Sequence, residues 1–105
     1  MRRTIQRVPT ADRMASAHLA AAHLYAQGAS RVWLFGSLAR GRPQDDRSDI
    51  DLAVEGLPPH LYYRMVSELD QLVHCTVDLV EFENASPRLR SQIENCRVLL
   101  PPHED

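Results

Sequence analysis

The sequence of 105 residues lacks most of the features that mark membrane, secreted or disulfide-stabilised proteins. Its two cysteines, Cys75 and Cys96, have no paired-ligand spacing, and we expect reduced thiols in the interior of a cytoplasmic protein. No apolar run is long enough to cross a bilayer, and none follows the basic N-terminus as in a secretory signal. These absences favour one cytosolic domain over residues 1–105, with 1–8 and 101–105 as flexible tails.

The sequence also lacks an excess of charge of either sign. Its net charge is −2 at neutral pH, so the overall charge gives no reason to expect binding to nucleic acid or to an anionic membrane. The histidines form no cluster with ligand spacing, which argues against a zinc site. Neither nucleic acid nor a membrane is therefore expected as a partner.

What the sequence does contain is an alternation of helical and strand-like segments. Apolar residues recur at three- and four-residue steps in the predicted helices, and short β-rich apolar runs indicate the strands. The predicted elements, in order, are a helix at 10–27, strands at 31–35 and 49–54, a helix at about 59–73, a strand at 76–82, a helix that begins at Ser86-Pro87, and an extended end at 98–100. We predict an α/β (α+β) domain with a short mixed sheet of three or four strands packed against helices.

Two carboxylates one residue apart, Asp49 and Asp51, open the second predicted strand. Side chains alternate between the faces of a strand, so both carboxylates should point the same way. Like charges held that close repel each other unless a cation lies between them, and oxygen ligands of this kind suit Mg²⁺ or Mn²⁺. Asp78 is a natural third ligand, because an unpaired carboxylate in an otherwise apolar strand is costly. We expect these three aspartates to bind two Mg²⁺ ions.

A glycine-serine turn precedes the carboxylates and suits a phosphate. Gly36 allows the backbone to approach a phosphate closely, and Ser37 adds a hydroxyl and a helix-start N–H. Arg40 and Arg42 could reach the β- or γ-phosphate as delocalised cations. The turn and the carboxylates together predict metal-assisted chemistry on a nucleoside triphosphate.

Each of these residues also has an ordinary explanation. The aspartate pair alone would suit a solvated corner, and Asp78 could pair with a buried arginine. Ser37 could be a plain turn residue. For Arg40, a salt bridge to the acidic residues at 45–46 explains the residue equally well. The combination of all these features favours the metal site.

Three stretches carry a resemblance to a known family. The stretches 36–37, 39–41 and 48–52, which read Gly-Ser, Ala-Arg-Gly and Ser-Asp-Ile-Asp-Leu, resemble the signature of the DNA polymerase β-like nucleotidyltransferases. The whole chain is similar to the minimal nucleotidyltransferases (MNT) of that superfamily. One difference is that residues 38–48 separate the serine from the first aspartate, one residue more than is usual.

The resemblance implies a site and a reaction. Residues matching Asp49 and Asp51 bind both metal ions in active members, and the residue matching Asp78 completes the site and is placed to act as general base. The Gly-Ser turn contacts the β- and γ-phosphates. Minimal members of the MntA type serve as antitoxins to HEPN-domain toxins, and some transfer AMP from ATP to a tyrosine of that partner.

The sequence leaves alternatives to this function. The chain has little beyond the catalytic core, so we expect another protein, or a second copy of this chain in a homo-oligomer, to bring the acceptor. A non-catalytic antitoxin that neutralises its partner by binding is the second hypothesis. Transfer to a small molecule or to RNA is the third.

Overall fold

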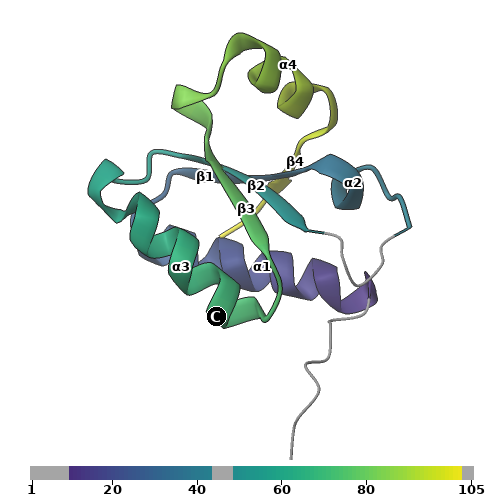
Figure 1. The fold of residues 1–105 in the computed structure, drawn as a ribbon, viewed down its shortest axis with the longest axis horizontal. Coiled ribbons are helices and arrows are strands. Elements are labelled where there is room, and N and C mark those ends of the chain that lie inside the picture. The colour runs from purple at the N-terminus through teal and green to yellow at the C-terminus, as the bar shows by residue number, and fades with distance from the viewer. Residues whose placement is uncertain (1–9, 44–48, 103–105) are drawn as a thin grey trace, which may run out of the picture.

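The computed structural model describes residues 10–43 and 49–102, which form one four-stranded sheet with helices on both faces (Figure 1). The elements in chain order are α1 Thr10–Ala26, β1 Arg31–Phe35, α2 Gly36–Ala39, β2 Ile50–Glu55, α3 Tyr62–Val73, β3 Val77–Glu81, α4 Pro87–Cys96 and β4 Val98–Leu100. Short 3-10 turns precede α3 and follow β3. Of the expected tails at 1–8 and 101–105, only residues 101–102 are described, and they are exposed and outside any helix or strand.

The sheet is mixed, as predicted. Its strand order is β3-β2-β1-β4. Strand β1 pairs antiparallel with both β2 and β4, whereas β2 and β3 are parallel and are connected through α3. The extended segment at 98–100 is therefore the fourth strand, and β2 begins at Ile50, one residue later than predicted.

One face of the sheet carries the main hydrophobic core. Alternate residues of the strands, such as Val32, Leu52 and Leu79, point toward α1 and α3 and are nearly inaccessible to solvent. Burial of these aliphatic side chains is the main source of folding free energy in such a layer. The thiol of Cys75 is buried in this core, as expected, whereas Cys96 is only half-buried.

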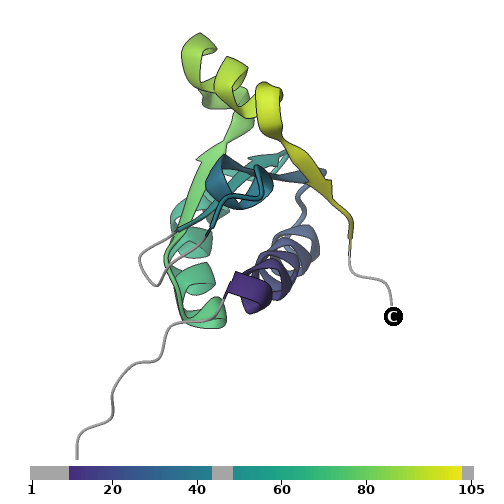
Figure 2. The same ribbon diagram turned by 90° about the vertical axis from the view of Figure 1, so that its right-hand side faces the viewer.

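The opposite face carries a smaller core under α4. Figure 2, turned by 90°, shows α4 on the other side of the sheet from α1 and α3. Ile93 of α4 is fully buried against Ala53 and Phe82, and Trp33 packs beside them. The Arg97 guanidinium lies 4.1 Å from the centre of the Trp33 ring, a cation–π contact that ties the end of α4 to the sheet. This small core covers only part of its face.

Helices of the described part of the chain are all too short or too polar to cross a membrane.

Candidate active site

The predicted site residues converge at one end of the sheet. In the strand register, Phe35 at the end of β1 lies opposite Asp51, and Asp51 lies beside Asp78 on the parallel strand β3. Paired residues on neighbouring strands point to the same face. That face is the one that carries α4, because the residues flanking Asp51 in β2, Ile50 and Leu52, point into the core under α1 and α3.

Gly36 makes room for the Asp51 carboxylate. Its backbone has a φ of +77°, a conformation that residues with a side chain rarely adopt. A Cβ atom placed on Gly36 would lie 2.1 Å from Oδ2 of Asp51. The turn at the end of β1 therefore requires glycine at position 36 for two reasons: the positive φ, and the space that the Asp51 carboxylate fills.

The Asp51 carboxylate has electrostatically unfavourable surroundings. It is half-buried. Burial, and then the negative charges of Asp78 and Asp49, raise the pKa of Asp51 from 3.8 to about 6. A divalent cation at this place would relieve that negative potential.

Asp49 and Asp78 are both exposed, and this corrects the reason for choosing Asp78. The sequence suggested a buried carboxylate that needs a metal ion, whereas the desolvated member of the group is Asp51. Among the described residues, no ion pair joins Asp78 to an arginine, so that alternative is not supported. Asp49 precedes the first residue of β2 and still acts electrostatically on Asp51.

The three carboxylates share a neighbourhood but do not already surround one point. Within residues 10–43 and 49–102, no three Asp, Glu, His or Cys side chains are close enough to hold an ion as they stand. Coulombic interaction reaches further than the roughly 2.0–2.6 Å of metal–oxygen bonds. The charges of Asp49 and Asp78 can therefore raise the pKa of Asp51 even though the three carboxylates are not yet close enough to bind one ion. The donor set is made only of oxygen and fits Mg²⁺ or Mn²⁺, with phosphate oxygens able to supply further ligands.

The glycine-serine turn is the first turn of α2. Phe35, at the N-cap position, has no polar side chain to cap the helix. The first N–H groups of a helix have no acceptor within the helix, and they suit phosphate oxygens. Ser37 is half-buried in this turn, directly after the glycine that contacts Asp51. The turn and the carboxylates are therefore adjacent.

Arg40 and Arg42 follow α2, and both residues are exposed. The backbone N–H of Arg40 donates to the carbonyl of Gly36 at 3.1 Å, and that of Arg42 donates to the carbonyl of Ser37 at 3.0 Å. These bonds hold the start of the loop against the turn. Residues 44–48, in the loop before Asp49 that is one residue longer than usual, lie outside the described residues. They include the acidic residues at 45–46 that could pair with Arg40. The role of both arginines remains a prediction.

Two contacts beside Asp78 were not expected from the sequence. The Asp70 carboxylate accepts a hydrogen bond from the N–H of Val77 at 2.8 Å, and the Tyr62 hydroxyl donates to the carbonyl of Leu79 at 2.6 Å. Both side chains belong to α3. No local pattern could have revealed them, because they depend on how α3 packs beside β3.

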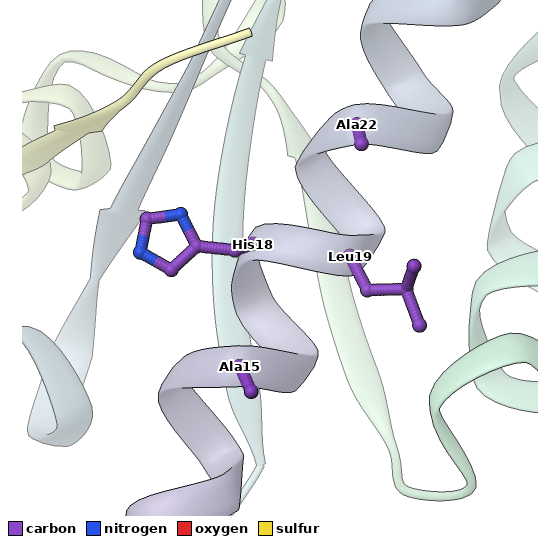
Figure 3. Close-up of a pocket in the computed structure, with 4 residues that line it drawn as sticks. All are labelled: Ala15, His18, Leu19 and Ala22. Carbon is purple, nitrogen blue, oxygen red and sulfur yellow. The ribbon is translucent and has the colours of Figure 1, made fainter. Parts of the chain in front are cut away.

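A hollow lies on the outer face of α1, away from the carboxylate face. Its volume is about 360 Å³, and its lining residues are Ala15, His18, Leu19 and Ala22 (Figure 3). Leu19 is 49% exposed there. The lining residues offer apolar surface and one imidazole, and they include neither a carboxylate nor the phosphate-binding turn.

Residues 24–104 match the family model described as "Polymerase beta, Nucleotidyltransferase". Among curated proteins, none matches this chain. Solved structures do. A candidate minimal nucleotidyltransferase is similar over 87% of this chain and 95% of its own, with 30% identity and a TM-score of 0.71.

Two further similar structures are toxin–antitoxin complexes. One, with AMP-PNP, matches with 22% identity and a TM-score of 0.66 over 92% of this chain and 76% of the other. The second contains a tri-AMPylated HEPN toxin of Shewanella oneidensis with an MNT antitoxin. It matches with 22% identity and a TM-score of 0.59 over 83% of this chain and 73% of the other. At 22% identity, these matches show that a chain of each complex shares the fold of this protein.

Proposed function

We propose that this chain, which belongs to the polymerase β nucleotidyltransferase family, is a Mg²⁺-dependent enzyme that transfers a nucleotidyl group from a nucleoside triphosphate to a protein hydroxyl. The observation that carries the proposal is the register that sets Asp51 beside Asp78, with Gly36 packed directly on the Asp51 carboxylate. A phosphate-binding turn next to a group of carboxylates is what such a transfer requires.

Each residue has a role in the proposed reaction. Asp49 and Asp51 would hold two Mg²⁺ ions, with Asp78 as a third ligand. When bound, such ions stabilise the charge on the entering and leaving oxygens. The turn at 36–37 would hold the β- and γ-phosphates, with Arg40 and Arg42 in support. The oxygen of the acceptor hydroxyl would bond to the α-phosphorus while the bond from that phosphorus to the departing pyrophosphate breaks. Asp78 would accept the proton that this hydroxyl loses.

The proposed donor is ATP and the proposed acceptor is a HEPN-type toxin, for which this chain would be the antitoxin. The support comes from relatives of the same fold, one solved with AMP-PNP and one with an AMPylated HEPN toxin. The structure is consistent with an external acceptor, since Asp49 and Asp78 are both exposed.

Labelled ATP tests this function directly. The chain is incubated with Mg²⁺, a HEPN-domain protein as the candidate acceptor, and ATP labelled at either the α- or the γ-phosphate. We expect the α label, and not the γ label, to appear on the partner, and Asp49→Asn to abolish it. Absence of α label with the wild type, or undiminished label with Asp49→Asn, would disprove the proposal.

A purely binding antitoxin is the second candidate, and the hollow on α1 favours it. An exposed apolar helix face is a common contact surface between proteins. Growth rescue separates the two functions: the double variant Asp49→Ala/Asp51→Ala should fail to protect cells from the toxin if catalysis is required. Full protection by that variant would mean that binding is sufficient.

A further inference from the structure

The strand that carries Asp78 is held by the sheet from one side only. Strand β3 is at the end of the strand order and pairs with β2 alone within the described sheet. Edge strands expose a row of backbone N–H and C=O groups and are less constrained than central strands. Asp51, by contrast, lies on β2 between two strands. The backbone of Asp78, the proposed third ligand, is therefore less rigidly supported by the sheet than the backbone of Asp51.

Side chains of α3 bind the open edge of β3 on either side of Asp78. Asp70 accepts from the N–H of Val77 at 2.8 Å, and the Tyr62 hydroxyl donates to the carbonyl of Leu79 at 2.6 Å. Alternate residues of a strand direct their backbone groups to the same edge, so Val77 and Leu79 both face away from β2. Asp78 is the residue between these two bonds.

The Tyr62 ring is itself held in place. It is half-buried, and the Tyr63 ring contacts it edge-on, with 5.1 Å between the ring centres and 76° between the planes. Its hydroxyl therefore has little freedom to leave the carbonyl of Leu79. Tyr63, at 83% exposure, provides a natural comparison for Tyr62 because it carries the same hydroxyl one residue away.

We infer that Tyr62 and Asp70 are positioning residues that hold Asp78 in register with Asp51 for the proposed nucleotidyl transfer. The inference rests on the proposed function. A ligand group has to be held within about 0.5 Å of its productive place, and a displacement of about 1 Å can cost roughly a hundredfold in rate. The two bonds supply on the open edge of β3 the constraint that a neighbouring strand supplies elsewhere.

The test compares variants that differ by one hydrogen bond. Tyr62→Phe and Asp70→Ala each remove one bond, whereas Tyr63→Phe leaves both bonds and Asp70→Asn keeps an oxygen acceptor for Val77. We expect kcat for label transfer to fall about tenfold in the first two variants, with KM for ATP within about twofold of wild type. The two controls should keep wild-type kcat.

A second measurement does not depend on turnover. Amide hydrogen exchange across residues 76–80 should be faster in Tyr62→Phe and Asp70→Ala and unchanged in the two controls, with the exchange of β1 unaffected. Wild-type kcat in both bond-deleted variants of an active enzyme would overturn the inference and leave the proposed function standing. Unchanged exchange in both would overturn it as well. A wild-type chain without transfer activity would instead disprove the proposed function itself.

Discussion

At the scale of single residues, Gly36 determines whether the Asp51 carboxylate can occupy its place. Two glycines of this region have nearly the same positive φ, +77° at Gly36 and +72° at Gly41. A Cβ atom on Gly36 would meet Asp51, whereas nothing in the described part of the chain lies within 4 Å of a Cβ placed on Gly41. The pair therefore separates backbone strain from the contact with the carboxylate.

We predict that Gly36→Ala lowers transfer activity about a hundredfold or more, because the carboxylate has to move. Gly41→Ala should keep most of the activity, although both variants lose roughly 1–2 kcal/mol of stability through the left-handed backbone. Steady-state kinetics and urea unfolding of the two variants measure these effects. Equal activity losses in both would show that the contact with Asp51 is irrelevant.

Asp51 also makes stability depend on pH. Its pKa is about 6 in the folded chain, raised by burial, Asp78 and Asp49 from the ordinary 3.8. The folded state therefore binds the proton more tightly than the unfolded state. The resulting stabilisation is fully present below about pH 4 and is lost as the pH rises through about 6.

We expect Asp51→Asn to be more stable than wild type at pH 7.5 without divalent ions, by about 1 kcal/mol once solvent screening of the half-buried group is allowed for. The advantage should disappear near pH 4. Urea unfolding at the two pH values measures it. An advantage of equal size at both values would show that ionisation of Asp51 is not its cause.

The sequence identified the site residues unevenly. Asp49, Asp51, Gly36 and Ser37 form a local pattern, and the structure places the turn at 36–37 beside Asp51, with Asp49 close enough for its charge to act on Asp51. Asp78 was chosen on the assumption that it is buried, yet it is exposed. Burial depends on how far α4 covers the sheet, which strand periodicity does not reveal.

At the scale of elements, α4 is the helix that shares its face of the sheet with the carboxylates. The Ser86 hydroxyl caps it by accepting from the N–H of Leu89 at 3.2 Å, as the Ser-Pro pair predicted. We predict that Ser86→Ala lowers the free energy of unfolding by about 1 kcal/mol. Ser91→Ala, at an exposed position within the same helix, should not destabilise the fold. Chemical denaturation distinguishes them, and equal stability of both variants would contradict the cap.

Element boundaries and pairings were predictable to different degrees. The β-rich runs and helical periodicities identified every helix of two turns or more and the first three strands, because those signals are local. The pairing of β4 with β1 is not local. It depends on α4 returning the chain to the edge of β1, and three residues carry too little pattern to indicate a strand alone.

At the scale of the whole molecule, the two faces of the sheet differ in kind. One is closed by α1 and α3 over the main core, and the other carries the carboxylates beside the small core of α4. Ligands that bind the carboxylate face should stabilise the folded chain. We predict that Mn²⁺ with AMP-PNP, at ten times its dissociation constant, adds about 1.4 kcal/mol, or roughly 5–10 °C in Tm.

The double variant Asp49→Asn/Asp51→Asn should show no such rise in Tm. Thermal unfolding followed by circular dichroism measures it. An equal rise in the variant would place the nucleotide elsewhere on the molecule.

The intact mass of a HEPN-domain partner, after incubation with this chain, Mg²⁺ and ATP, measures the proposed nucleotidyl transfer itself. We predict one or more adenylate adducts with the wild type and none with Asp49→Asn/Asp51→Asn. A partner whose mass is unchanged by the wild type, or equally changed by the double variant, would contradict this prediction.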